Sequence, residues 1–453
     1  MSKRSLPQPF GIEEINLRSC FTAPSLRHFA LLIVGWVLTV ERHTISRILL
    51  TLKLHDTEHY SNIYRFISRA NWSIDAVAQR LFRWMVDALQ MPGQEIMVIL
   101  DDTLNKHTGR KICGAGWQHD GSARNGQTHD HGICLVIIGL AVTLPKVNGR
   151  VFCLPYVARL WFPHVAKIKP RDQPYKSKPE LGLELINLTH SWLRKDEKLR
   201  VVADVGYSCK AIISNKPKEV NFTGRMRIDA ALHDVPKQRT KGSKGRPRTK
   251  GDRLPTPREM FNDKDLPWEN TTILLYGKEV PVAIYHFYAL WPYSAGRTVL
   301  SLLLCRDPKG VRHDTVLFDT DCTAPKPSIA SRYSMRWSIE ITNRETKHLL
   351  GTADPQCRTQ KAVIRTPLIG LWAYSFVVVW FIKNFRTGRL SLPGPSPWYG
   401  RKTNITFSDM LAMARRSHFV LRFSTKAWKT ADFVEMSLTR PPRVSIFSKR
   451  AKL

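Results

Sequence analysis

The sequence is poor in acidic residues. Its 453 residues contain 37 Asp and Glu but 70 Lys and Arg, which gives a formal net charge of +33 at pH 7. So large a positive charge indicates a polyanionic partner, with nucleic acid the first expectation and an anionic membrane surface the second. Because 43% of the residues are hydrophobic, the chain is not a disordered polycation, and its length is enough for two or three domains.

Paired cysteines and long apolar segments are also missing. None of the 8 cysteines forms a Cys-x-x-Cys pair, which argues against a zinc ribbon and a disulfide scaffold and favours a reducing compartment. No secretory apolar region precedes Arg27. The longest stretch without a charge, residues 366–382, is at the lower limit for a membrane span, so we expect a buried core helix there.

The N-terminal part, residues 1–92, has the pattern of helices. Two short amphipathic helices are expected at 44–54 and 60–69 around a polar turn, and a longer helix follows the N-cap residue Ser73. Such a pair is typical of a helix-turn-helix, whose DNA-facing side chains would be Tyr64, Arg65, Ser68 and Arg69. An ordinary helical bundle is the alternative.

From residue 95 onward, short apolar strands alternate with helices, which predicts an α/β architecture. Strands are expected at 96–100, 134–144, 150–156 and 199–203, with a helix at 181–193. More strand-like segments lie between 216 and 325, and helices are expected at 327–350 and around 367–382.

A basic loop, residues 237–258, interrupts the strand-rich region. It carries nine Lys and Arg against one acidic residue, Asp252, and is punctuated by glycines and prolines. Its core, Gly245-Arg246-Pro247-Arg248 with Lys244 beside it, resembles an AT-hook, which binds a narrow minor groove. A loop that binds phosphates without sequence preference is the alternative.

Three carboxylate positions have surroundings that suit catalysis. Asp101 and Asp102 end one apolar strand and Asp204 ends another, and sites in α/β sheets form at the carboxyl ends of strands. The third position is on a helix, where four side chains fall within about 60° of one another at helical spacing. These four are Tyr333, Arg336, Glu340 and Lys347.

Carboxylates beside cations predict a metal site that acts on phosphates. Hard oxygen ligands select Mg²⁺ or Mn²⁺, and two such ions can activate an attacking oxygen and stabilise a leaving one. The neighbouring Arg and Lys would hold phosphate oxygens, so that a phosphodiester is the natural substrate. Turn aspartates and solvated Arg–Glu pairs are common too, and they are the alternative explanation.

These residues together resemble a known family. The spacing Tyr333-x2-Arg336-x3-Glu340-x6-Lys347 matches the signature of DDE transposases from bacterial insertion sequences. Residues 100–103, Leu-Asp-Asp-Thr, are similar to that family's first-aspartate motif, and residues 202–207 are similar to its second. The usual Arg of the second motif is replaced by Val205. The resemblance extends over residues 95–350.

The resemblance implies a catalytic site of Asp102, Asp204 and Glu340 that holds two Mg²⁺ or Mn²⁺ ions. Side chains alternate along a strand, so only one of the two adjacent aspartates can face the metals. Asp102 is the first choice because the family's catalytic Asp directly precedes the Thr, and Asp101 is the second choice.

Further DNA contacts are implied by the same resemblance. Arg336 and Lys347 would contact phosphates beside the scissile bond, and Tyr333 would bind a phosphate or pack against the DNA end. Trp291 lies in the strand-rich region, where related transposases stack an aromatic residue on a flipped base. Core packing is the alternative for Trp291.

The fold that the resemblance implies is an α/β ribonuclease H-like catalytic core with a β-rich insertion, preceded by an α-helical N-terminal DNA-binding domain. Residues 1–92 would form the DNA-binding domain, and residues 93–215 and 326–390 the two parts of the core. The insertion would be 216–325, with its basic loop, and the remaining residues, 391–453, would be a basic C-terminal region.

The activity implied is cut-and-paste transposition, in which a DNA end is cleaved and its 3′-hydroxyl is joined to target DNA. The expected partners are terminal inverted repeats, target DNA and a second copy of the chain in a synaptic homodimer, with no membrane. The expected location is the bacterial cytoplasm, at the nucleoid. Two alternatives are an inactive DNA-binding relative that acts as a repressor and a standalone metal-dependent nuclease.

Overall fold

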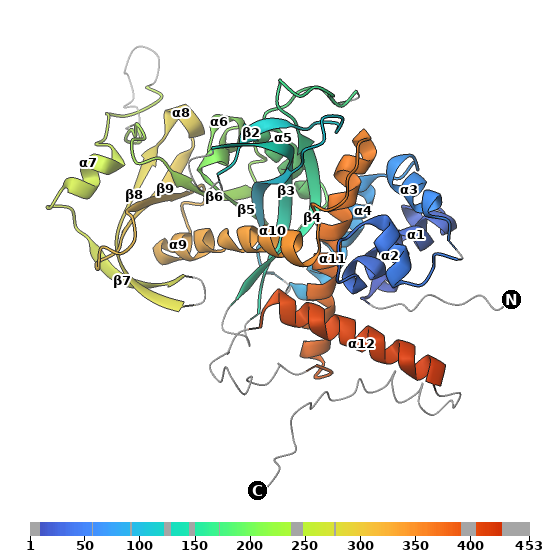
Figure 1. Ribbon diagram of the computed structural model, residues 1–453. Helices are drawn as coiled ribbons and strands as arrows, with labels where there is room; N and C mark the ends of the chain where they lie inside the picture. The colour runs from blue at the N-terminus through green and yellow to red at the C-terminus, as the bar shows by residue number, and fades with distance from the viewer. Residues whose placement is uncertain are drawn as a thin grey trace, which may run out of the picture.

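The computed structural model describes residues 10–427 except 57, 91–92, 122–127, 145–149, 172, 237–247, 276–277 and 391–404. Within these residues, ten strands form a single mixed sheet with helices packed around it (Figure 1). The α/β class expected from the sequence is therefore confirmed.

Five strands form the central half of the sheet. Their spatial order is β4 (Val151–Trp161), β3 (His129–Thr143), β1 (Ile96–Lys106), β5 (Leu199–Ala203) and β6 (Val220–Met226). β1 is antiparallel to β3 and parallel to β5, and β5 is parallel to β6. This arrangement fits a ribonuclease H-like core. The short β2 (Gly116–His119) pairs with the start of β3.

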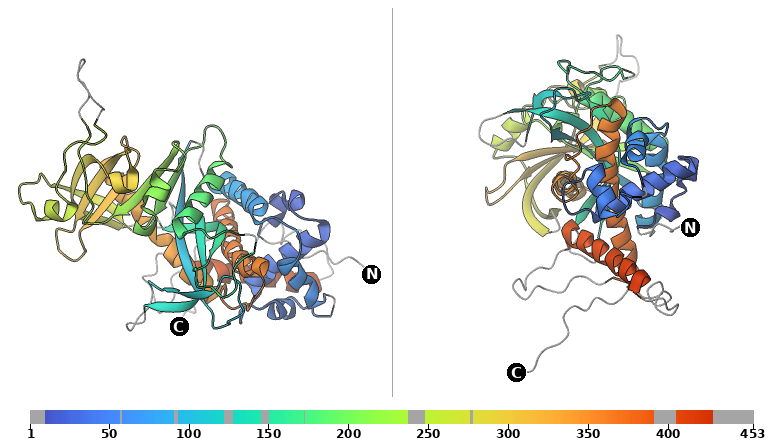
Figure 2. Two further views of the ribbon diagram at one scale, coloured as in Figure 1. Left: turned by 90° about the horizontal axis from the view of Figure 1, so that it is seen from above. Right: turned by 45° about the vertical axis from the view of Figure 1, so that its right-hand side comes forward.

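The strand-rich region continues this sheet. β10 (Thr315–Asp319) pairs with β6, and β9 (Val299–Arg306), β8 (Lys278–Leu290) and β7 (Glu269–Leu275) follow as an antiparallel ladder. Figure 2 shows this ladder extending away from the N-terminal helices. β6 lies beyond the predicted boundary at residue 215, yet its parallel pairing with β5 joins it to the core. Two short helices, α7 (Pro257–Asn262) and α8 (Pro292–Ala295), lie in the same region.

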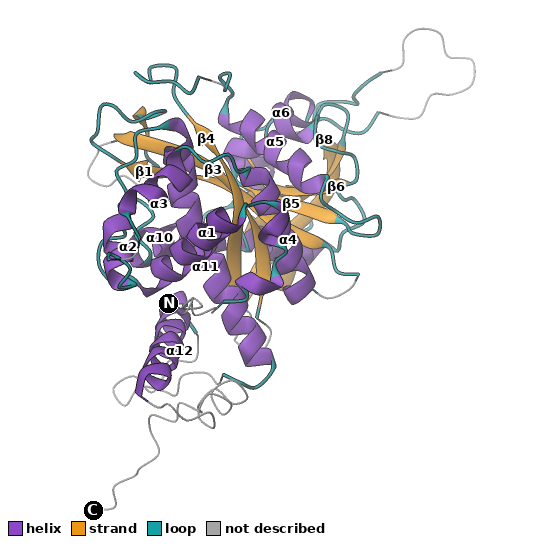
Figure 3. Ribbon diagram, turned by 90° about the vertical axis from the view of Figure 1, so that its right-hand side faces the viewer, coloured by secondary structure: helices purple, strands orange, loops and turns teal. Residues whose placement is uncertain are grey.

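The N-terminal helices pack directly on the rest of the protein. After the single turns η1 (Ile12–Glu14) and η2 (Leu17–Ser19), they are α1 (Ala23–Leu38), α2 (Ile45–Thr51), α3 (Tyr60–Ser68) and α4 (Ile74–Leu89). α1, α3 and α4 contact α11 (Gln360–Arg386), and α4 also contacts β4 (Figure 3). Tyr64, Arg65 and Arg69 remain exposed on this bundle, so the proposed DNA-facing surface stays a prediction.

α11 is the central helix of the molecule. Among the described residues it is the one helix long and apolar enough to cross a membrane by length and composition, and 94% of its most apolar window is buried inside the protein. This agrees with the core helix expected at 366–382. Arg365 in α11 donates to the carbonyl oxygens of Ile67 and Trp72 and lies over the Trp72 ring, which fixes the end of α3 against the core.

The remaining helices follow the strands of the core and the insertion along the chain. α5 (Lys178–His190) begins with a capping box between Ser177 and Glu180, and η3 (Val205–Tyr207) and α6 (Lys210–Ile213) follow β5. The helix expected at 327–350 is divided in two, α9 (Lys326–Ser334) and α10 (Trp337–Leu349). α12 (Phe407–Ala427) packs on α1, α10 and α11.

Candidate active site

The pairing register brings two acidic residues side by side. Leu100 of β1 is opposite Ala203 of β5, so the next residues along the two parallel strands are Asp101 and Asp204. Asp204 ends the strand and caps η3, where its Oδ1 accepts a hydrogen bond from the Val205 amide at 2.7 Å. Asp204 follows the end of its strand, as expected from the sequence, whereas Asp101 lies within β1, which continues to Lys106.

The α9–α10 junction adds a carboxylate and two hydrogen-bond donors. The Tyr333 hydroxyl donates to Asp204 Oδ1 at 3.3 Å. Arg336, in the turn between the two helices, reaches Asp101 Oδ2 with Nη1 at 3.5 Å and donates to Glu340 through Nη2. Arg336 thus connects β1 with α10, and Asp101, Asp204 and Glu340 gather around its side chain.

Burial gives this cluster unusual electrostatics. Burial raises the pKa of Asp101 to about 7; Arg336 opposes that shift, while the charges of Asp102 and Glu340 add to it. Burial also raises the pKa of Tyr333 to about 12. For Arg336, burial alone would lower the pKa, but Tyr333 and the surrounding carboxylates raise it, so the guanidinium stays charged. Three acidic side chains thus share the surroundings of one arginine.

Asp102 lies on the other face of β1. Its Oδ2 accepts a hydrogen bond from Lys178 Nζ of α5 at 2.6 Å, and its Oδ1 accepts one from the Tyr207 hydroxyl at 2.9 Å. Cys134 of β3 is a further donor, with Sγ 3.4 Å from Oδ2. The structure does not bring Asp102 together with Glu340, because adjacent strand residues point to opposite faces. The residue that shares the face of Glu340 is Asp101, the second choice of the sequence analysis.

Lys347 does not extend toward this cluster. Its Nζ donates to the carbonyl oxygen of Leu104 in β1 at 2.8 Å. Burial lowers the pKa of Lys347 to about 8. In this position the ammonium holds α10 against β1, and the predicted phosphate contact would require it to leave that carbonyl.

The carboxylates of the cluster have the donor atoms that a hard metal ion prefers. Within the described part of the chain, no three His, Cys, Asp or Glu side chains already stand close enough to hold an ion together. The donor chemistry nevertheless fits a hard divalent cation, because Asp101, Asp204 and Glu340 are all oxygen donors gathered around one cationic group.

The residues of the insertion that were predicted to contact DNA differ in their exposure. Trp291 is only 5% exposed and packs edge-on against Phe318 at 5.9 Å between ring centroids, so its ring is not available to stack on a base. This corrects the DNA-contact prediction for Trp291 in favour of core packing. Lys244 and Arg246 lie outside the described residues. Arg248 is exposed, with Nη1 3.6 Å from Asp252.

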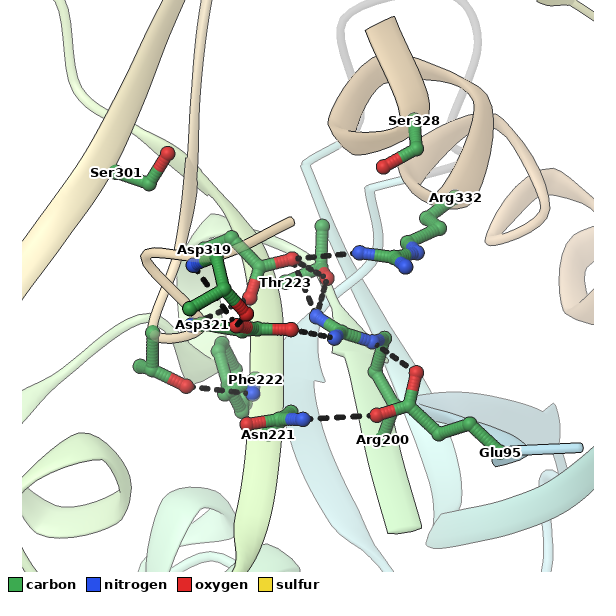
Figure 4. A network of polar contacts seen from close by, with 12 residues as sticks. Glu95, Arg200, Asn221, Phe222, Thr223, Ser301, Asp319, Asp321, Ser328 and Arg332 are labelled. Carbon is green, nitrogen blue, oxygen red and sulfur yellow. Dashed lines mark hydrogen bonds and ion pairs between the residues drawn. The ribbon is translucent and has the colours of Figure 1, made fainter. Parts of the chain in front are cut away.

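A buried ionic network holds α9 in place. Arg200 of β5 is 1% exposed and contacts Glu95, Asp319 and Asp321, three carboxylates around one guanidinium (Figure 4). Asp319, the last residue of β10, also lies 3.6 Å from Arg332 of α9, next to Tyr333. The return from the insertion is therefore fixed to the core through charge pairs that are costly to break singly.

This network was not predicted from the sequence, although the sequence carries a signal for it. An arginine inside the buried apolar strand 199–203 must find a carboxylate partner, because an unpaired buried charge is very unfavourable. Lys178 and Tyr207 were missed as well. Lys178 has only its position at the start of a helix as a signal, whereas Tyr207 ends the second-aspartate motif at residues 202–207.

Comparison with known proteins supports the assignment of the core. The protein-family model described as "DDE superfamily endonuclease" matches residues 16–274, which include Asp101, Asp102 and Asp204. The solved synaptic complex of piggyBac transposase with hairpin DNA is similar at 11% identity and a TM-score of 0.40, over 96% of this chain and 82% of that one. A search of curated proteins finds no match. Because the family model covers more than half of the sequence, the chain belongs to the DDE superfamily endonucleases.

Proposed function

We propose that the protein is a DNA transposase of an insertion sequence. It would cleave phosphodiesters at the ends of the element and join the freed 3′-hydroxyl to target DNA. The observation that carries this proposal is the gathering of Asp101, Asp204 and Glu340 around Arg336. These carboxylates come from β1, from the end of β5 and from α10, so the fold unites residues more than 200 positions apart in the sequence.

The first carboxylate in this proposal is Asp101, since it shares the face of Glu340. Asp101, Asp204 and Glu340 would hold two divalent ions, Mg²⁺ or Mn²⁺. When bound, such ions supply an activated attacking oxygen and stabilise the leaving oxygen of the phosphodiester.

The other side chains have supporting roles. Tyr333 orients Asp204 through its hydroxyl, since a hydrogen bond to one carboxylate oxygen leaves the other free to accept. Arg336 balances the charge of Asp101 and Glu340, and its fork of donors suits a phosphate of the DNA strand once it swings from Glu340. Lys347 keeps α10 at a fixed distance from β1.

The positive charge of the chain also bears on its partners and its location in the cell. The positive charge of +33 suits terminal repeats and target DNA as ligands, and two copies of the chain would be needed to hold two ends together. A bacterial, nucleoid-associated location is proposed on the same basis. The alternatives are a repressor without catalysis and a nuclease that cleaves without joining.

The test uses the purified full chain, Mg²⁺ and linear DNA that carries the sequences flanking the gene. Wild type is expected to yield both nicked ends and joined products, whereas Glu340→Gln yields neither. Glu219→Gln is the matched control and is expected to behave as wild type, because Glu219 is exposed and precedes β6 at the opposite end of the parallel strands from Asp204. DNA binding without cleavage by wild type would favour the repressor, and cleavage without joined products would favour the nuclease.

A further inference from the structure

We infer that a basic surface at the edge of the sheet binds the duplex DNA that flanks the cleavage position. This surface, here called the basic platform, consists of residues 107–115 after β1, residues 162–171 after β4 and residues 355–361 before α11. The inference deepens the proposed function and rests on it for the identity of the substrate. It concerns none of the residues of the catalytic cluster.

The three segments of the platform are joined by hydrogen bonds. The Cys113 amide donates to the Arg358 carbonyl oxygen at 3.1 Å, and the Gly114 amide donates to the Ile168 carbonyl oxygen at 2.7 Å. The Arg171 amide donates to Gln360 Oε1 at 3.1 Å. Figure 1 shows the start of α11 at the upper end of the molecule, beside the loop that follows β4. The platform is therefore one assembled surface.

Gly114 makes the close approach possible. Its φ of +78° is in the left-handed region, and a Cβ at this position would meet Leu160 Cδ2 at 2.9 Å. A residue with a side chain would strain the backbone and push residues 107–115 away from β4. The platform is thus held in shape before any ligand arrives.

The platform carries positive charge without internal compensation. Its three segments contain no Asp or Glu and seven exposed cations, Arg110, Lys111, Lys167, Lys169, Arg171, Arg358 and Lys361. In the described part of the chain, none of the seven forms an ion pair, whereas Arg47, Arg194 and Arg227 elsewhere on the surface each pair with a carboxylate. Of the acidic residues that border the segments, Asp354 accepts a hydrogen bond from the His43 amide, and Asp172 lies outside the described residues.

The position of the platform fits duplex DNA. β1 continues five residues beyond Asp101 to Lys106, a span of about 17 Å at the rise of an extended strand. Phosphates repeat every 3.4 Å or so along each DNA strand, so the platform begins about five base pairs from the carboxylates. A stiff polyanion anchored at the cluster would pass over these cations, and phosphate contacts of this kind need no base sequence.

The test measures the salt dependence of binding to a fluorescein-labelled 30-base-pair duplex of mixed sequence, in EDTA. Lys111→Ala, Lys169→Ala and Lys361→Ala are combined, one from each segment. Each phosphate contact contributes about 0.9 to the slope of log affinity against log salt, so the slope should fall by about 2 to 3. The control combines Arg194→Ala, Arg227→Ala and Lys326→Ala, where Lys326 pairs with Glu269. It changes the net charge equally but removes cations that are already paired, and its slope should fall by less than about 1.

Two further measurements keep the outcome clear. Circular dichroism checks that both triple variants are folded. A variant that combines Lys111→Arg, Lys169→Arg and Lys361→Arg keeps the three charges and should have the wild-type slope. Equal losses in the platform and control variants would overturn the inference, as would an unchanged slope. So would a platform variant that binds DNA normally but no longer sediments with vesicles of phosphatidylcholine and phosphatidylglycerol. Because binding is measured without metal, failure of the proposed cleavage activity would be seen separately.

Discussion

The two faces of β1 each carry an aspartate, and the two aspartates have different surroundings. Asp101 faces the α9–α10 junction, where it shares Arg336 with Glu340 and its pKa is raised to about 7 by burial. Asp102, the next residue, faces α5 and η3, where Lys178 and Tyr207 both donate to it. Asp101 is buried among other carboxylates beside one guanidinium, whereas Asp102 has an ammonium partner of its own. The first arrangement suits a metal ligand, and the second suits an anchor.

The hydrogen bonds of Asp102 also hold β1 in place. Asp102 joins β1 to the helix that follows β4 and to the turn that follows Asp204. Asp204, which caps that turn, would be a metal ligand. The face of β1 that carries Asp102, here called the anchor face, therefore fixes the distance between Asp101 and Asp204.

The largest effect should separate the two aspartates. Asp101→Asn is expected to lower Mg²⁺-dependent cleavage by about 10³-fold, because losing a metal ligand removes several kcal/mol of transition-state stabilisation at about 1.4 kcal/mol per tenfold. Asp102→Asn should lower it by only about tenfold, through looser positioning of β1. Single-turnover cleavage of flank DNA measures both. The opposite order of effects would make Asp102 the metal ligand, as the Asp-Thr motif in the sequence suggests.

A smaller effect is expected from the lysine that holds α10 on β1. Burial lowers the pKa of Lys347 to about 8 from its ordinary 10.5, so the native state releases a proton that the unfolded chain still binds between these values. The free energy of unfolding of wild type should therefore rise as pH increases from 8 toward 10.5. Lys347→Met lacks this contribution, and its stability relative to wild type should decrease over the same range. Urea unfolding at several pH values measures the difference, and a constant difference would contradict the burial of the charge.

The smallest effect tests the anchor face alone. Tyr207 is 3% exposed, and its hydroxyl donates to Asp102 while Lys178 remains as a second donor. Tyr207→Phe should lower the free energy of unfolding by about 1 kcal/mol and leave the cleavage rate within a few-fold of wild type. Urea unfolding at pH 7, together with the cleavage assay, gives both quantities. A loss of cleavage as large as that of Asp101→Asn would remove the distinction between the two faces.

Much of the candidate site could be read from residue spacing. Tyr333, Arg336 and Glu340 do lie together. Their separations of three and four residues keep them on one side of the chain even though α9 ends and α10 begins between them. Asp204 was placed correctly at a strand end, since a short apolar run followed by an acidic residue is a local signal. The extension of β1 to Lys106 was not predicted, because beyond Leu100 the strand pairs with β3 alone, and that partner is not visible in the local pattern.

The rest of the site depended on contacts between distant segments. Trp291 lies in a predicted strand-rich region, but only the packing of β10 beside it decides that Phe318 covers its ring. Asp319, one of the three carboxylate partners of Arg200, is 119 residues away, so no local pattern could have named it. The N-terminal helices were predicted individually, yet their attachment to α11 through Arg365 follows from tertiary packing.

The sequence by itself determined the α/β class, the order of the three acidic positions and the excess of positive charge. These are properties of composition and of short-range periodicity, and they persist in any arrangement of the chain. Only the tertiary structure decided which of two adjacent aspartates faces Glu340 and which cations on the surface are left without acidic partners. Both answers depend on which distant elements pack against each face of a strand, and a face is defined only once the sheet has formed.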